Sequence, residues 1–284
     1  MNLNPLHKDS SRMDRKDVAY FVNSTPKYFY LLPLHFTLVK RYASALKWPT
    51  YMVTETPQNQ TIQDLSNQLG VQILTIPDSE KFFLESRVAA CKALPNSIQY
   101  VFPIQEDFLL GGRIDEKAIE EALQIFDSDS NVASVRLMPC PGPKAGSPRY
   151  KSSNFFVLDE DFMFTFQATL WRREAYQLFL SAVLDIPEEA FHLRYPGNVR
   201  DELQKKKFLQ VDFNIAENTF GQRKLREVLG SKIHLAWPRA HPNPNAVMLC
   251  PWPYRPTAVE KGKLGEWVYE FAKREGFPIQ ATLI

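Results

Sequence analysis

Two adjacent carboxylates at the end of an apolar run are the residues of this sequence best suited to chemistry. Residues 100–110 read YVFPIQEDFLL, so that Glu106 and Asp107 interrupt a stretch of aromatic and branched side chains. A buried strand has no place for two acids in its interior, which puts them at the end of the strand. In open α/β sheets ligands gather at the carboxyl ends of strands, and two acids there favour a divalent cation that holds an anionic substrate such as a diphosphate. The simpler alternative is an exposed turn in which the acids pair with Arg113.

Strand-like and helix-like segments alternate through the first half of the chain and would position these acids. Predicted strands are 18–22, 50–54, 71–76, 100–104 and 132–138, and predicted helices are 31–46, 61–69, 82–94 and one that begins at the capping residue Asp115. Repeated alternation of this length is typical of a mostly parallel sheet with helices on both faces. We therefore expect an α/β fold.

The second half begins with a segment rich in proline, glycine and serine. Residues 139–153 include Lys144, Arg149 and Lys151, and their composition predicts a mobile loop. These cations could close over a diphosphate and neutralise a leaving group, although charges in a flexible loop are commonly only solvated. An extended segment at 162–171, helices at 172–184 and 214–229, and a proline-rich extended stretch at 237–256 that wraps the surface are expected to follow.

Composition excludes several classes of protein. The chain has 284 residues, 44% of them hydrophobic, and a net charge of +2 with its basic residues dispersed, so we expect a core and no nucleic-acid partner. The longest apolar stretch, 28–39, is far shorter than the roughly 20 residues that span a bilayer. The amino terminus lacks the apolar region of a signal peptide, which predicts a cytoplasmic protein. Three dispersed cysteines argue against a disulfide framework and a zinc cluster.

Two short motifs give the chain a family resemblance. Gln105-Glu106-Asp107 ends the apolar strand, and Gln167 and Trp171 bound a Gln-x-x-x-Trp segment further along. This pattern resembles GT-A-fold glycosyltransferases, and particularly poorly characterised bacterial and viral members with a Gln-Glu-Asp variant of the DXD motif. The resemblance implies a GT-A-like sandwich, a nucleotide-sugar donor bound over the first four strands, a hydroxyl acceptor such as a glycan, and a divalent metal, manganese or magnesium, that bridges the donor phosphates.

The resemblance also assigns roles to individual residues. Asp107 would ligate the metal, with Glu106 as a further ligand or neighbouring acid, and Gln105 would hydrogen-bond a ribose hydroxyl. The remaining assignments are Thr25 and Glu55 for the base and ribose, Arg87 for the nucleotide or a phosphate, His241 for the metal, and Gln167 and Trp171 for the acceptor. For Arg87 a solvated helix face is the alternative, for Thr25 and Glu55 it is ordinary turn chemistry, and His234 is expected to be structural.

Glu217 is the candidate general base. Inverting glycosyl transfer needs a carboxylate that takes the proton of the acceptor hydroxyl, and related enzymes place it at the amino end of a helix. Asn214 and Glu217 also have the spacing of a capping box, which is the structural alternative, and Asp212 is the second candidate. A nucleotidyltransferase on a similar sheet and a catalytically inactive sugar-binding protein are the rival functions.

The expected organisation has four parts. Residues 1–16 would be a disordered tail, 17–138 the nucleotide-sugar-binding half, 139–236 the acceptor and catalytic half, and 237–284 an extended segment with a helix.

Overall fold

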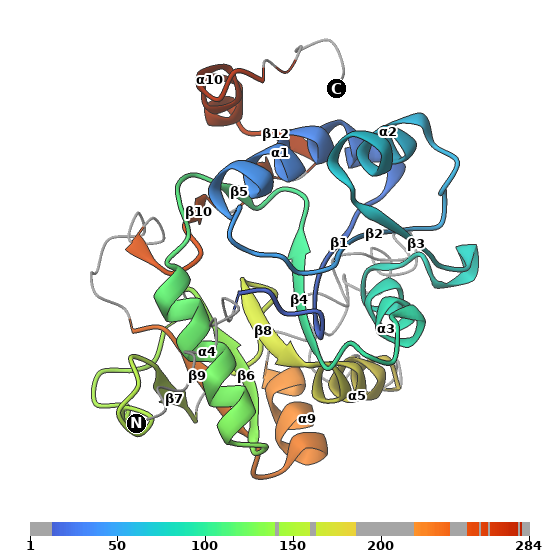
Figure 1. The fold of residues 1–284 in the computed structure, drawn as a ribbon. Coiled ribbons are helices and arrows are strands. Elements are labelled where there is room, and N and C mark those ends of the chain that lie inside the picture. Colours follow the sequence, from blue (N-terminus) through green and yellow to red (C-terminus); the bar gives the residue numbers. More distant parts are fainter. Residues whose placement is uncertain are drawn as a thin grey trace, which may run out of the picture.

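An eight-stranded sheet lies at the centre of the protein (Figure 1). The computed structural model describes residues 13–139, 142–159, 163–185, 219–238, 249–255, 257–260, 262–277 and 279. In the sheet the strands follow the order β3-β2-β1-β4-β8-β6-β9-β7. They are β1 (Val18–Asn23), β2 (Thr50–Thr54), β3 (Gln72–Thr75), β4 (Tyr100–Gln105), β6 (Val132–Arg136), β7 (Phe156–Leu158), β8 (Thr169–Arg172) and β9 (Ile233–Ala236).

Most of these strands run in one direction. β1 pairs in parallel with β2 and β4, and β2 pairs in parallel with β3. β8 is antiparallel to both β4 and β6, so β6 runs with β4, and β9 is parallel to β6. The prediction of a mostly parallel sheet is confirmed. It follows that β1, β2, β4 and β6 all end at one edge, here called the carboxyl edge, and begin at the opposite amino edge.

Helices cover both faces of this sheet, as predicted. Val18, Tyr20 and Val22 of β1 belong to the apolar core on one face, and the alternate residues Ala19 and Phe21 belong to the core on the other. The first core is covered by α1 (Leu32–Tyr42), α2 (Gln60–Leu69) and α4 (Glu116–Ser128), and the second by α3 (Phe83–Ala93), α5 (Arg173–Leu184) and α9 (Thr219–Leu229).

Local sequence signals fix several helix ends. The Asp115 carboxylate accepts a hydrogen bond from the Ala118 amide at 3.1 Å and caps α4, as predicted. Gly70 ends α2 with φ = 70°, a left-handed conformation that glycine adopts without strain. The predicted helix 31–46 was too long, because α1 ends at Tyr42. Leu31 belongs to the preceding 3₁₀ turn, η1 (Pro26–Leu31). Of the predicted extended segment 162–171, the described residues 163–171 form a strand only at their end, in β8.

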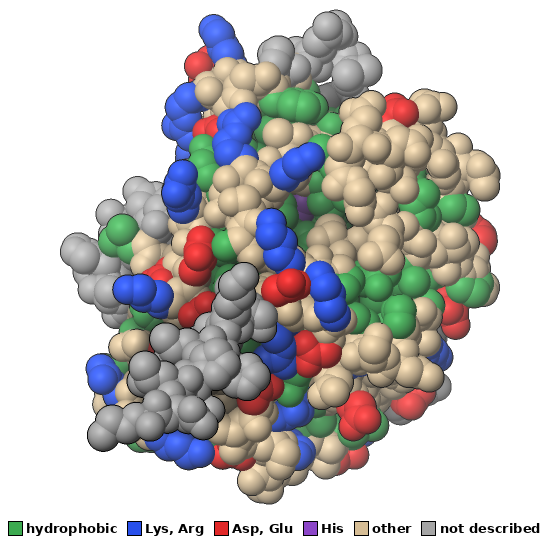
Figure 2. All heavy atoms as spheres, in the orientation of Figure 1, with side chains coloured by type: hydrophobic (Ala, Val, Ile, Leu, Met, Phe, Trp, Pro, Cys, Tyr) green, Lys and Arg blue, Asp and Glu red, His purple; other side chains and the backbone are tan. Residues whose placement is uncertain are grey.

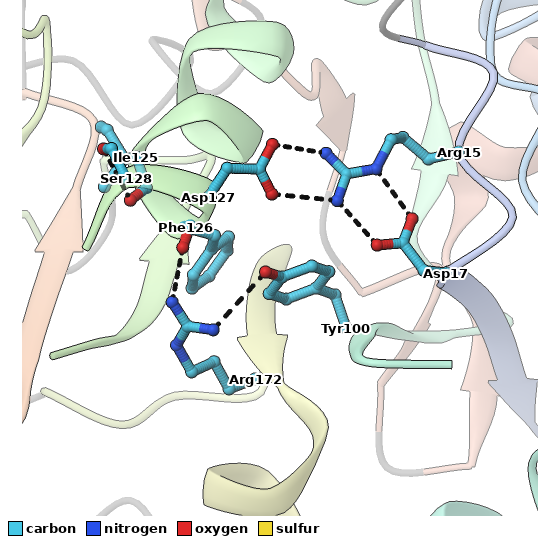
Figure 3. Close-up of polar contacts among 8 residues, drawn as sticks. All are labelled: Arg15, Asp17, Tyr100, Ile125, Phe126, Asp127, Ser128 and Arg172. Atoms are coloured by element: carbon cyan, nitrogen blue, oxygen red, sulfur yellow. Dashed lines mark hydrogen bonds and ion pairs between the residues drawn. The ribbon is translucent and has the colours of Figure 1, made fainter. Parts of the chain in front are cut away.

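Two arginines at the amino edge each form hydrogen bonds to several neighbouring residues (Figure 3). Arg15 bonds both oxygens of Asp17 and pairs with Asp127 of α4 at 2.8 Å. Arg172 donates to the carbonyl oxygens of Phe126, Asp129 and Val132 at 2.6–2.9 Å. The predicted tail 1–16 is therefore wrong for residues 13–16, since Arg15 ties this segment to the sheet and Met13 is buried.

The last part of the chain returns to the sheet's core. β10 (Tyr254–Arg255) pairs with β5 (Leu109–Leu110), directly after the acid pair. A hairpin of β11 (Val259–Glu260) and β12 (Lys263–Leu264) and then α10 (Glu266–Arg274) follow. Trp252 and Tyr254 are fully buried, and Trp252 packs on Tyr20 and Phe102. The expectation that residues up to 256 wrap the surface is thus wrong for this described part, because the pairing with β5 draws it inward.

Charge on the face drawn in Figure 2 is mixed in sign. Lys and Arg side chains lie among Asp and Glu across the left and centre of this view. Proteins bind a polyanion with closely spaced cations. This face has no continuous patch of cations of that kind. Among the described residues, no helix combines the length and apolar character needed to cross a membrane.

Candidate functional site

The acid pair lies where the sequence predicted, in the turn that ends β4. The amide of Phe108 donates to the Gln105 carbonyl at 3.1 Å and closes this turn around Glu106 and Asp107. Asn23, the last residue of β1, lies beside Gln105 in the parallel ladder. The ends of the neighbouring strands β1 and β4 therefore present an amide and two carboxylates at one point of the carboxyl edge.

Several polar atoms at this point are buried without a partner. Asp107 is 9% exposed, and its Oδ1 has no hydrogen-bond partner among the described residues. The same holds for both Oδ1 and Nδ2 of Asn23, whose side chain is 7% exposed. An unpaired buried polar group costs about 1–3 kcal/mol of stability, so each one calls for an explanation. A ligand that supplies the missing partners is such an explanation.

The electrostatics of the pair point the same way. Burial raises the pKa of Glu106 above its usual range, and the neighbouring carboxylate of Asp107 raises it further. Burial likewise raises the pKa of Asp107, against a weaker opposing effect of the Val259 amide. Two desolvated carboxylates repel each other unless a proton or a cation lies between them. The site is therefore suited to bind positive charge.

Arg87 of α3 is buried behind the pair rather than solvated. Its side chain is 2% exposed, its Nη1 donates to the Phe83 carbonyl at 2.9 Å, and its guanidinium lies 3.8 Å from the centre of the Phe83 ring. Burial lowers the pKa of Arg87, an effect opposed by Tyr176 and by both acids. The alternative of a solvated helix face is thus wrong, and Arg87 provides fixed positive charge near Glu106 and Asp107.

His35 of α1 holds the backbone of the acid pair, and the sequence analysis missed it. Burial lowers the pKa of His35 to about 4, so its ring is neutral near pH 7. Nδ1 lies 3.1 Å from the Glu106 carbonyl, which only accepts, so Nδ1 carries the proton. Nε2 then accepts from the Tyr20 hydroxyl at 2.6 Å. A histidine within the apolar stretch 28–39 was the one signal of this role.

The carboxyl-terminal segment completes the surroundings of Asp107. The Ala258 amide donates to the Asp107 carbonyl at 3.0 Å, and the Val259 amide lies 3.5 Å from Oδ2. Burial raises the pKa of Tyr30, and Tyr28, Tyr269 and both acids raise it further. No periodic pattern in the sequence predicted this contact, because it joins segments about 150 residues apart.

The other predicted donor residues lie at the same edge. Thr25 and Glu55, which follow β1 and β2, are both half-buried, as is Gln105. Thr25 makes no side-chain hydrogen bond to cap η1, although it begins that turn. The side chains of Thr25 and Gln105 therefore remain open to a ligand, and their assigned roles stay predictions.

The two predicted acceptor residues differ. Gln167 is half-buried, and its Oε1 accepts a hydrogen bond from the Tyr254 hydroxyl. Trp171 is 1% exposed and packs against Phe164, Tyr176 and His234 in the core. An indole buried on all sides cannot stack on a sugar. The prediction that Trp171 contacts an acceptor is therefore wrong, and its role is structural.

The basic loop does not bring Lys151 to the acids. Its ammonium pairs with Asp129 at 3.2 Å, and the Tyr150 hydroxyl donates to the same carboxylate at 2.6 Å. Asp129 precedes β6 and so belongs to the amino edge, opposite the acid pair. Arg149 lies over the Phe156 ring at 5.5 Å. The predicted role of Lys151 in a phosphate lid is therefore wrong. The same role for Lys144 and Arg149 stays a prediction.

Three predicted catalytic or metal-binding residues lie outside the described residues. They are Glu217, the alternative base Asp212, and His241. Within the described part, no group of three or more His, Cys, Asp or Glu side chains could enclose a metal ion. The two carboxylates of Glu106 and Asp107 still fit a magnesium or manganese ion, because such ions are commonly bound by one or two carboxylates together with substrate phosphates.

Comparison with known proteins adds weak structural likenesses. No protein-family model matches the chain, and no curated protein is significantly similar to it. A 4-diphosphocytidyl-2C-methyl-D-erythritol synthase from Anaerococcus prevotii is 13% identical with a TM-score of 0.38 and covers 73% of this chain and 86% of its own. S. aureus TarS 1-349 in complex with UDP-GlcNAc is 13% identical with a TM-score of 0.39 and covers 76% and 72%. A cytidylyltransferase from Leptospira borgpetersenii is 11% identical with a TM-score of 0.37 and covers 68% and 73%. Likenesses this weak leave the function to be argued from the site.

Proposed function

We propose that the protein is a metal-assisted glycosyltransferase that binds a nucleotide-sugar at the carboxyl edge and transfers the sugar to a hydroxyl acceptor. The observation that carries the proposal is the set of buried, unpartnered polar atoms on Asp107 and Asn23 at the end of β4 and β1. These atoms stand beside two carboxylates whose pKa values are raised by burial. A diphosphate with its cation would satisfy them together, which neither an empty turn nor a purely structural cap does.

The residues have distinct parts in this proposal. Asp107 and Glu106 would hold a magnesium or manganese ion, which supplies charge neutralisation for the diphosphate leaving group. Asn23 has both a donor and an acceptor without a partner among the described residues, and Thr25, Glu55 and Gln105 would contact base and ribose. Arg87 limits the repulsion between the two acids when no ligand is bound, because it adds positive charge behind them.

The acceptor side of the proposal depends on Glu217. As a general base it would take the proton of the attacking hydroxyl, and its replacement by Gln would lower turnover by about a hundredfold or more. Gln also serves a capping box, so Glu217→Gln leaves stability nearly unchanged. Normal turnover of this variant would return Glu217 to a structural role and leave Asp212 as the candidate.

A product assay separates glycosyl transfer from its rivals. The protein is incubated with a panel of nucleotide-sugars and manganese, and separately with sugar phosphates and nucleoside triphosphates. Release of nucleoside diphosphate from a nucleoside-diphosphate sugar supports glycosyl transfer, whereas release of pyrophosphate from a triphosphate indicates nucleotidyl transfer.

Binding without turnover is the second candidate function, and one observation favours it. Gln105 stands where many members of the resembled family have an acid, and an amide is a poor metal ligand. The result expected for this candidate is thermal stabilisation by a nucleotide-sugar with no hydrolysis at any metal concentration. Absence of both stabilisation and turnover across the panel would overturn the proposed function.

A further inference from the structure

A cavity lies at the amino edge of the sheet, on the opposite side from the acid pair. Its volume is about 620 Å³, within the range of roughly 300–1,000 Å³ that is typical of small-molecule sites. Its walls come from the carboxyl-terminal half of α1, the loop before β2, and the end of α2 with the start of β3. α1 runs back from the carboxyl edge after β1, so all these segments meet where the parallel strands begin.

The cavity walls are largely apolar. Phe36 and Val39 of α1, Trp48 and Leu46 of the following loop, and Val71 before β3 line it. Tyr20 also lines the cavity, although its hydroxyl is already bonded to His35. The body of a ligand held here would therefore be mainly hydrocarbon or aromatic. Ser44, Thr50 and Gln72 also line the cavity, and the Trp48 Nε1 is a buried donor without a partner among the described residues.

The charge on the lining is of one sign. Lys16, Lys40 and Lys47 line the cavity, and no Asp or Glu of the described part of the chain does. Lys16 pairs with Asp14 at 2.8 Å and Lys47 donates to the Ser44 carbonyl at 2.9 Å, so both ammonium groups are partly engaged. Lys40 is exposed, and no ion pair to it is formed among the described residues. Lys40 thus offers an uncompensated cation at the mouth of an apolar cavity.

We propose that this cavity binds a small amphipathic anion, with its apolar body against Phe36, Val39 and Trp48 and its single carboxylate or phosphate group at Lys40. An uncharged apolar molecule would leave the lysines without counter-charge, and a nucleotide would place polar groups against the apolar walls. The site is distinct from the acid pair, which lies at the other end of the strands.

Titration calorimetry with decanoate, decyl phosphate and decyltrimethylammonium, each below its micelle concentration, tests the proposal. The two anions are expected to bind at one site per chain, and the cation of equal chain length at least tenfold more weakly. Decanoate and decyl phosphate distinguish a carboxylate ligand from a phosphate ligand. Equal binding of all three amphiphiles would show unspecific apolar adsorption and overturn the proposal.

Variants place the binding in this cavity. Ser44 lines it and is exposed, so Ser44→Trp is expected to fill it and abolish binding of decanoate, while Ser79→Trp on a remote exposed turn leaves binding unchanged. Lys40→Glu is expected to weaken binding at least tenfold. Lys92→Glu, the same charge change at an exposed position of α3, is expected to weaken it less than twofold. Circular dichroism confirms that each variant is folded. Undiminished binding by folded Ser44→Trp, or loss of binding in Asp107→Asn, would overturn the assignment.

Discussion

The two edges of the sheet differ in how their buried charged and amide side chains are partnered. At the amino edge, Arg15 and Arg172 bond two carboxylates and three carbonyl oxygens, and Tyr100 lies between the two guanidinium groups (Figure 3). At the carboxyl edge, Asp107 and Asn23 keep buried atoms without partners. β1 and β4 thus begin beside a satisfied charged network and end beside unpartnered amide and carboxylate atoms, although the indole Nε1 of Trp48, ahead of β2, is also buried at the amino edge without a partner among the described residues.

This difference suggests that the amino edge of the sheet serves stability and the carboxyl edge serves ligand binding. A satisfied network contributes to the free energy of unfolding, whereas unpaired buried groups lower it and are retained where a ligand can satisfy them. Substitutions at the amino edge are therefore expected to unfold the protein without a specific effect on ligand binding. Substitutions at the carboxyl edge are expected to abolish ligand binding while the fold survives.

The largest effect on stability is expected at Arg172. Arg172→Met removes the donors to three carbonyl oxygens while it keeps part of the aliphatic stem, and we expect the free energy of unfolding to fall by about 3–5 kcal/mol. Urea unfolding followed by tryptophan fluorescence measures this loss. Arg173→Met is no suitable control because Arg173 also binds carbonyl groups, so the same change at the exposed Arg113 serves instead. A loss below about 1 kcal/mol would remove the amino edge as the stabilising half of the comparison.

At the carboxyl edge, Asp107→Asn is expected to separate binding from folding. A nucleoside diphosphate with manganese at a hundred times its Kd stabilises the parent by about 2.7 kcal/mol, and the variant loses this linked stabilisation. The unliganded fold should be as stable as the parent, because the charge that is removed was poorly compensated. Thermal melting with and without ligand measures both quantities, with the exposed Asp78→Asn as control. Equal stabilisation of Asp107→Asn and parent would refute a ligand role for Asp107.

Periodic features of the fold were predictable from the sequence. The alternation of strands and helices, the cap at Asp115 and the position of Glu106 and Asp107 at the end of β4 all depend on local patterns of about 5–15 residues. Antiparallel insertion of β8 between β4 and β6 was not predictable, because the order of strands depends on contacts distant in the sequence.

The candidate site was predictable only in part for the same reason. The acids stand out in an apolar run, but the burial of Arg87 depends on packing against Phe83 and Phe166 from different segments. The support of Glu106 by His35 and of Asp107 by Val259 joins elements that no local pattern connects. Residue type thus predicted which groups could act, and tertiary contacts decide which of them can reach a ligand.

The middle of the sheet is expected to respond to acid before the amino edge does. Burial and, to a lesser degree, Arg136 lower the pKa of His234 to about 3, so that the unfolded chain binds its proton more readily below pH 6.5. The contribution of His234 to the free energy of unfolding should therefore fall as pH drops from 6.5 toward 3, by at most about 1.4 kcal/mol per pH unit. Buried His35 adds to this loss, whereas the raised pKa values of Glu106 and Asp107 oppose it.

The amino edge follows at lower pH. The Tyr150 hydroxyl and the Asn131 amide lower the pKa of Asp129 to about 2, so its contribution is present above pH 3.8 and is lost only as pH falls toward 2. Urea unfolding at pH 7, 6, 5 and 4 measures the first window, and His234→Gln should remove the part of the slope that His234 contributes. An unchanged slope in His234→Gln would assign the acid response to other groups.

The smallest effect is expected at Asn23, and its sign is the sharpest test of the comparison. Asn23 ends β1 with both side-chain polar atoms buried and unpartnered, so Asn23→Val removes an unsatisfied amide and adds a residue that favours strands. We expect the free energy of unfolding to rise by about 1 kcal/mol while diphosphate binding weakens. Val22→Ala, one residue earlier and fully buried in the core, should instead destabilise without a specific effect on binding. Urea unfolding and calorimetric titration of the nucleoside diphosphate are read on both variants. A destabilised Asn23→Val with unchanged affinity would mean that the amide serves the fold, and the two edges would then no longer differ in kind.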